Sequence, residues 1–164
     1  MIEKGANIHY EDDQAIIQAS KFGHLSVMKL LIELGSDIHI QDNLAIMWAS
    51  LNGHVSVVKL LIEKGASIHS QFHEAISLAS QGGHLSVIKL LIDYGAYIQI
   101  RDNEVIIWAS CAGNFDVVKL LIDYGANARA RNNYALKYAL KNGYWKISGL
   151  LIYRLVCNIM GIYK

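Results

Sequence analysis

Glycine recurs along the chain at two fixed positions of a 30-residue period. A period of this length is typical of solenoids, in which each repeat is a small unit that buries its apolar face only against its neighbours. The two series are Gly5, Gly35, Gly65, Gly95 and Gly125, and Gly23, Gly53, Gly83, Gly113 and Gly143. This register predicts a single domain, made of a partial repeat at 1–11, repeats at 12–41, 42–71, 72–101 and 102–131, and a degenerate C-terminal repeat or cap at 132–164.

Each unit predicts two short helices. In 42–71, NLAIMWASLN places Ala45, Ile46 and Ala49 at helical spacing before Gly53, a residue suited to a left-handed helix end. The following HVSVVKLLIEK carries a broad apolar face and ends in the same way at Gly65. The remaining ASIHSQFH is too short for a third helix, so we expect an all-α solenoid of stacked helix-turn-helix units joined by short loops. Helices of this length are marginal alone, and the units must therefore stack.

Small residues occupy two positions of the first helix in the repeats. We expect them to pack between neighbouring units and to let the helices approach closely. They are Ala19, Ala49, Ala79, Ala109 and Ala139, and Ser20, Ser50, Ser80 and Ser110.

Composition argues for a packed chain without a strong electric field. Hydrophobic residues make up 53% and charged residues 18%, and fifteen basic against fourteen acidic residues give a net charge of +1. Such a balance does not concentrate nucleic acid, and the Lys and Glu or Asp four residues apart on each second helix mix the two signs. The apolar runs stop well short of the roughly 20 residues of a membrane span. We expect neither nucleic acid nor membrane as a partner.

Cysteine and histidine give no sign of a catalytic or metal centre. Cys111 and Cys157 lack paired spacing, and MIEKGANIHYEDD lacks the pattern of a secretory signal, so an intracellular protein that is not secreted is expected. His24, His54 and His84 follow the first glycine of their units, and we expect them to open the second helix and bond backbone locally or in the next unit. The sequence predicts no cofactor, no metal and no enzyme.

The pattern A-S-x-x-G-H-x-x-V-V-K-L-L-I-E-x-G-A closely resembles the second half of the ankyrin repeat, and the match covers nearly the whole chain. Ankyrin units have a period of about 33 residues and open with T-P-L-H, whereas here Leu44-Ala45-Ile46-Met47 stands at that place and no proline occurs. The missing residues fall in the inter-repeat loop, so the resemblance implies a shortened β-hairpin finger. The 30-residue D-N-x-A-I-x-x-A-S variant resembles ankyrin proteins of giant amoeba-infecting DNA viruses (mimivirus-like), which implies the host cytoplasm.

The resemblance implies a non-catalytic scaffold that binds a host or viral protein through the first helices and the loops. Packing forces repeats to agree, so positions at which they differ are the candidates for binding. Those at the ends of the first helices are Lys21, Phe22, Leu51, Asn52, Gln81, Cys111, Lys141 and Asn142. The loops add Asn43, Phe72, His73 and Asn103, and the residues before the second glycine add Tyr94 and Tyr124. Trp48, Trp108 and Tyr138 are expected mainly to pack between units.

Two alternatives stay open. The apolar tail YRLVCNIMGIYK, in which Leu155 replaces the glycine that ends the other second helices, predicts a helix that runs on toward Asn158. Together with the incomplete first unit, where we expect fraying, it allows a structural or self-assembling component that associates through apolar terminal segments. An enzyme is the weakest alternative, because no nucleophile and base interrupt the repeat.

Overall fold

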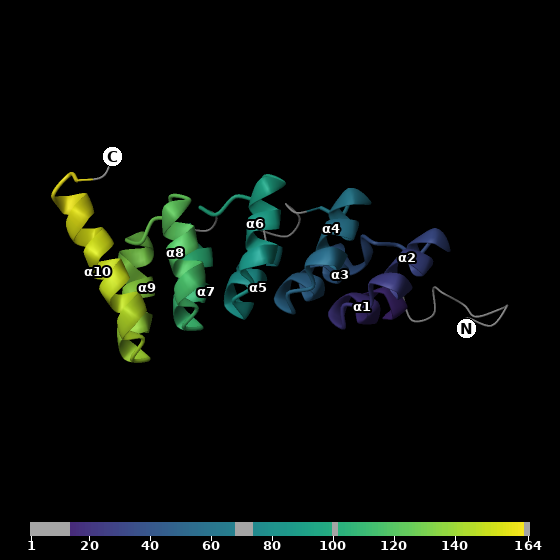
Figure 1. The fold of residues 1–164 in the computed structure, drawn as a ribbon, viewed down its shortest axis with the longest axis horizontal. Helices are drawn as coiled ribbons and strands as arrows, with labels where there is room; N and C mark the ends of the chain where they lie inside the picture. The colour runs from purple at the N-terminus through teal and green to yellow at the C-terminus, as the bar shows by residue number, and fades with distance from the viewer. Residues whose placement is uncertain (1–13, 68–73, 100–101, 163–164) are drawn as a thin grey trace.

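The computed structural model describes residues 14–67, 74–99 and 102–162, which form ten helices and contain no β-strand. The helices lie in pairs along one row, with α1 and α2 at one end and α9 and α10 at the other (Figure 1). Their bounds are α1 (Gln14–Lys21), α2 (Leu25–Glu33), α3 (Ile40–Leu51), α4 (Val55–Glu63), α5 (Glu74–Gly82), α6 (Leu85–Asp93), α7 (Glu104–Cys111), α8 (Phe115–Asp123), α9 (Ala130–Lys141) and α10 (Trp145–Ile159). The predicted all-α, helix-turn-helix architecture is confirmed.

The helices form two layers with the core between them. Each odd-numbered helix contacts the next odd-numbered helix, and the even-numbered helices form a second row in the same way. Ile46 and Ile106 from the first layer and Leu61 and Leu91 from the second are at most 1% exposed. Burial of one such side chain stabilises the fold by about 2 kcal/mol. The same core residue types thus recur with the repeat.

Small residues line the contacts within the odd-numbered layer, as the repeat pattern predicts. The five repeat-equivalent alanines from Ala19 to Ala139 are at most 4% exposed, and Ser20, Ser50, Ser80 and Ser110 are fully buried. Because these side chains are short, each odd-numbered helix packs directly against its neighbours.

The histidines after the first glycine join neighbouring repeats. His54 Nε2 lies 2.9 Å from the Lys21 carbonyl oxygen, and His84 Nε2 lies 2.8 Å from the Leu51 carbonyl oxygen. The His54 ring also covers Gly23, where a Cβ atom would lie 2.5 Å from Nδ1. The bond to backbone is confirmed, but its partner belongs to the preceding repeat and not to the next one. We call this series of contacts the His–Gly ladder.

Asn43 and Asn103 hold the connecting segments in place. Their φ angles are 68° and 61°, in the left-handed region that asparagine tolerates better than most residues. Asn43 Oδ1 accepts the Ser67 N–H at 3.2 Å, and Asn103 Oδ1 accepts the Asn127 N–H at 2.7 Å. Only 7% and 8% of the two residues is exposed. Their placement on the partner-binding surface is therefore wrong, because their polar groups face the domain's own backbone.

We expect Asn103→Ala to lower the free energy of unfolding by about 2–3 kcal/mol, because it loses a hydrogen bond and leaves a Cβ residue at positive φ. Asn103→Gly keeps the backbone conformation and should cost only about 1 kcal/mol. Urea unfolding followed by circular dichroism measures both values. Equal stability of Asn103→Ala and the wild type would contradict the assigned role.

The start of α3 and the first part of α9 differ from the regular helices that the repeat predicts. α3 begins at Ile40 with a distorted turn, in which Gln41 has a φ of 46°, and α9 contains a similar left-handed run from Arg131 to Asn133. α10 continues to Ile159, so the predicted extension toward Asn158 is confirmed. Between α2 and α3 only residues 34–39 connect the helices. The expected fraying of the first residues lies outside the described part of the chain.

Candidate docking surface

An apolar stripe crosses the exposed side of the odd-numbered helices. Trp48, Leu78, Trp108 and Tyr138 occupy one repeat position on α3, α5, α7 and α9, and Gln18 stands there on α1. Trp48 is half-buried and packs against the core, as expected. Trp108 is more open than Trp48, with 40% of the residue exposed and the larger part covered.

A cation lies between two aromatic rings at the start of this stripe. Lys21 Nζ is 4.7 Å from the centre of the Trp48 ring and 5.8 Å from that of Phe22. Ammonium groups at this distance are attracted by the ring quadrupole. Phe22 itself is 59% exposed, which is a large apolar area for the surface of a folded domain.

Two tyrosines pair at the other end of the stripe, on α9. A side-chain hydrogen bond with Tyr134 raises the pKa of Tyr138, and the two rings meet edge to face with centroids 4.9 Å apart. Desolvation by burial raises the pKa of the half-buried Cys111 thiol. The thiolate is the reactive form of cysteine, so Cys111 is not activated by its surroundings.

The predicted residues at the ends of the odd-numbered helices line the edge of the stripe. Gln81, Lys141 and Asn142 are exposed, and Leu51 is half-buried with its carbonyl engaged by His84. The Asn52 side-chain amide donates to the Trp48 carbonyl oxygen at 2.9 Å. This edge combines exposed side chains with polar groups that bond backbone carbonyl oxygens, as Asn142 Nδ2 does with that of Cys111 at 3.5 Å.

Tyr94 and Tyr124 lie on a different edge. They follow α6 and α8 and are 43% and 47% exposed. Paired helices joined by so short a turn run antiparallel, so these tyrosines lie at the opposite end of the pair from Gln81 (Figure 1). The structure therefore divides the predicted set between two edges of the domain.

The variation among the repeats was not used to predict Tyr97 as a surface residue. Tyr97 is 68% exposed beside Tyr124 and helps to line a hollow with Ile92 and Gln99. The signal was available, since small or polar residues stand at the equivalent positions Asp37, Ser67 and Asn127. Phe72 and His73 lie outside the described residues.

Residues 14–67, 74–99 and 102–162 contain no group of three His, Cys, Asp or Glu placed to hold a metal ion. Within the same ranges no helix has the length and apolar character that crossing a bilayer requires.

A family model for ankyrin repeats, described as three copies, matches residues 1–72, 16–102 and 76–160. The chain belongs to the ankyrin-repeat family. No curated protein matches the chain. Ankyrin repeats generally mediate protein–protein interaction and are typically non-enzymatic scaffolds.

Proposed function

We propose that this ankyrin domain is a non-catalytic scaffold that binds another protein along the stripe of the odd-numbered helices. The observation that carries the proposal is the exposure of Phe22 and Trp108 on that side, at 59% and 40%. Large exposed aromatic residues are enriched among the side chains that contribute most to protein association. The rigid stack holds them at fixed spacing, which reduces the entropy lost on binding.

Charge indicates the kind of partner segment that fits. Lys21 and Lys141 end α1 and α9, and neutral residues from Trp48 to Tyr138 lie between them. We expect a partner segment with apolar side chains in its middle and acidic residues at its ends. Surface charges of this kind mainly raise the association rate, and the effect weakens with salt.

The proposal predicts that Phe22→Ala with Trp108→Ala reduces partner affinity by about 100-fold, since each exposed aromatic residue contributes about 1–2 kcal/mol. Both side chains are substantially exposed, so circular dichroism and the unfolding midpoint should stay close to the wild type. A partner captured from cell lysate and identified by mass spectrometry would be purified and titrated against each variant.

The matched control is Tyr94→Ala with Tyr124→Ala, which removes two aromatic rings of similar exposure from the other edge. It should leave the affinity unchanged. Loss of binding in this control, with full binding retained by the Phe22 and Trp108 variant, would place the interface on the tyrosine edge and reject the stripe.

We also propose that the protein is viral and acts in the host cytoplasm on a host partner. The support is the 30-residue variant of the repeat and the free state of Cys111 and Cys157, which suits a reducing compartment. Expression of a fluorescent fusion in host cells tests this, and accumulation in a secretory compartment would contradict it.

A further inference from the structure

The N-terminal end of the stack exposes a face that is buried in the inner repeats. Val27 on α2 is 45% exposed, whereas its equivalent Val57 on α4 is 1% exposed and Val87 on α6 is fully buried. Leu30 is likewise 41% exposed, while its equivalent Leu60 is half-buried. These residues therefore form the side of a second helix that a preceding repeat covers.

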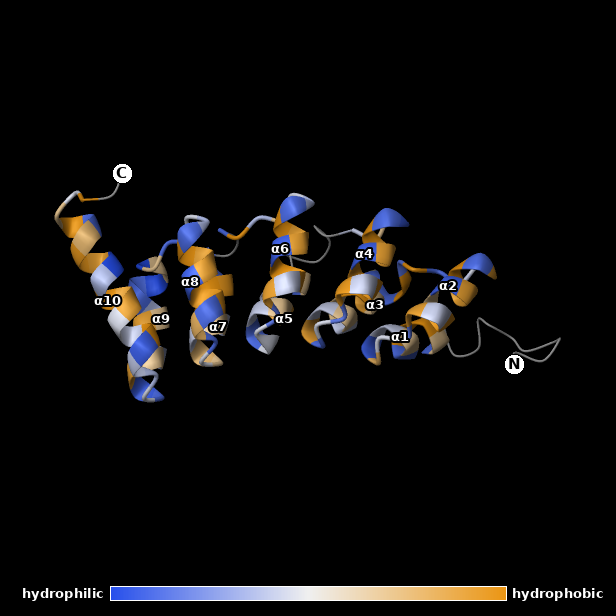
Figure 2. Cartoon of the chain, viewed as in Figure 1, coloured by the Kyte–Doolittle hydropathy of each residue, from blue (hydrophilic) through white to orange (hydrophobic). Residues whose placement is uncertain are grey.

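The opposite face is exposed at the C-terminal end. Ile152 on α10 is 46% exposed, whereas its equivalent Ile122 on α8 is 5% exposed. Leu140 on α9 is 44% exposed, although the equivalent Ser110 on α7 is fully buried. Figure 2 shows apolar colour along α10 at this end of the row. This is the side that a following repeat covers.

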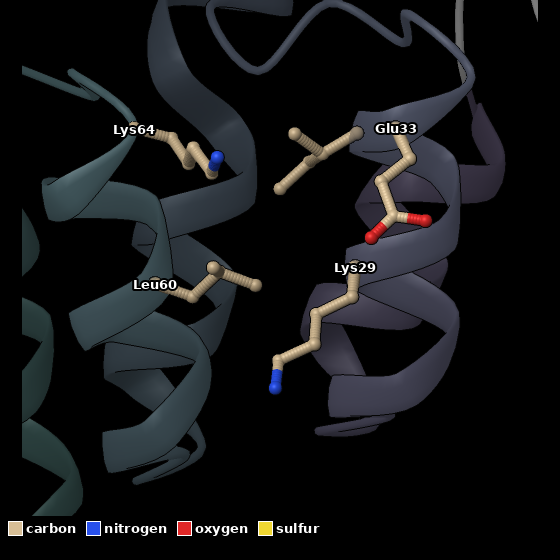
Figure 3. Close-up of a pocket in the computed structure, with 5 residues that line it drawn as sticks. Lys29, Glu33, Leu60 and Lys64 are labelled. Carbon is tan, nitrogen blue, oxygen red and sulfur yellow. The ribbon is translucent and has the colours of Figure 1, made fainter.

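Inside the stack these two kinds of face meet each other. Ile32 of α2 and Leu60 of α4 line one hollow between the two helices, and Figure 3 shows the Leu60 side chain directed toward α2. Leu30 and Ile152 are the repeat equivalents of Leu60 and Ile32. The two ends of the chain thus carry the two halves of a contact that the domain already makes between its own repeats.

The His–Gly ladder is open at the same two ends. Gly23, Gly53, Gly83 and Gly113 each lie against a side chain of the following repeat, but nothing lies within 4 Å of a Cβ built on Gly143. At the other end, His24 is exposed, unlike its half-buried equivalents His54 and His84. Among the described residues, Gly143 is therefore the uncovered glycine of this series, and His24 is its exposed histidine.

We propose that a second copy of this chain stacks head to tail on the first, with α1 and α2 of one copy against α9 and α10 of the other. Leu30 then faces Ile152, and His24 covers Gly143 and donates to the Lys141 carbonyl oxygen, as His54 does to that of Lys21. The contact joins different faces, so each dimer keeps one free face of each kind and further copies can add.

Single-face variants test this arrangement. Val27→Glu places a charge on the N-terminal face and Ile152→Glu places one on the C-terminal face, and both positions are exposed enough for the monomer to fold. Light scattering coupled to size exclusion should show concentration-dependent growth of the wild type. Each variant alone should associate at least about tenfold more weakly, because its carboxylate would be desolvated.

The decisive sample is the equimolar mixture of the Val27→Glu and Ile152→Glu variants. Each variant retains the face that the other has lost, so the mixture should form a complex of two copies and nothing larger. A wild type that stays monomeric at every concentration overturns the proposal. So does loss of association by Ile152→Glu with no effect of Val27→Glu, because that result indicates symmetric contact between two α10 helices.

Further variants separate stacking from misfolding and from partner binding. Leu30→Glu and Leu140→Glu repeat the experiment at independent exposed positions. They are used if the circular dichroism spectrum of Val27→Glu or Ile152→Glu differs from that of the wild type. Ser56→Glu, on an exposed site of α4, should associate normally. Trp108→Ala alone, on α7 and away from both end faces, should also associate normally, so failure of the stacking proposal and failure of the docking proposal remain distinguishable.

Discussion

Replacing Gly53 with alanine is expected to lower the free energy of unfolding by about 3–5 kcal/mol. Gly53 has a φ of 76°, which costs a residue with a Cβ about 1–2 kcal/mol. The added Cβ would also lie 2.7 Å from His84 Cε1, so the ring that joins the two repeats has to move. Overpacking of this kind adds about 1–3 kcal/mol. Urea denaturation monitored by circular dichroism measures the change.

Gly143→Ala is the matched control for this experiment. Its φ of 72° imposes a similar backbone cost, but no atom lies within 4 Å of the new Cβ. We expect a loss of only about 1–2 kcal/mol. The double variant Gly53→Ala with His84→Ala should recover part of the loss, because the ring that clashes is absent. Equal effects of Gly53→Ala and Gly143→Ala would show that the His–Gly ladder does not constrain the stack.

Val57→Asp is expected to destabilise the domain by at least about 3 kcal/mol and to unfold α4 together with its neighbours. Val57 of α4 is 1% exposed, and a carboxylate at this position would lose its water without gaining a partner. Because each repeat is stable only against its neighbours, the damage should spread beyond one helix. Hydrogen exchange of the backbone amides would show which helices lose protection.

Val27→Asp places the same substitution at the equivalent position of α2, where the side chain is 45% exposed. Its effect on the monomer should lie within about 0.5 kcal/mol, as for most surface changes. The measurement is made at low protein concentration so that association does not contribute. A similar loss of unfolding free energy for Val57→Asp and Val27→Asp would mean that the difference in burial between the two positions does not determine the effect.

Sequence reasoning succeeded where the physical requirement is local or repeats strictly. The helix pairs, the buried alanines and the extension of α10 follow from spacing, side-chain size and the missing glycine at Leu155. The predicted partner of His54 was wrong: its ring bonds to the preceding repeat and not to the next one. A repeat period shows that neighbouring repeats touch, but not which of the two neighbours a side chain reaches.

The candidate site was harder to predict for a related reason. Variation among repeats marks positions that tolerate change, but it does not separate exposed residues from buried ones that serve the backbone. Asn103 varies in this sense and is buried, whereas Trp108 resembles a core residue and is exposed. Tyr94 belongs to a second edge that only the antiparallel arrangement of the helices reveals.

The His–Gly ladder also bears on how such a chain changes length over generations. Each of the blocks 42–71, 72–101 and 102–131 carries both a glycine that is covered by a side chain of the next block and a side chain that covers the glycine of the block before it. Duplication or loss of a whole block therefore leaves every remaining block with complementary neighbours. Insertion or deletion of a few residues within a block displaces its glycine relative to its covering side chain, so the contacts with both neighbouring blocks are disturbed. Gain or loss of complete repeats therefore preserves the contacts that stabilise the stack, whereas a partial repeat loses some of them.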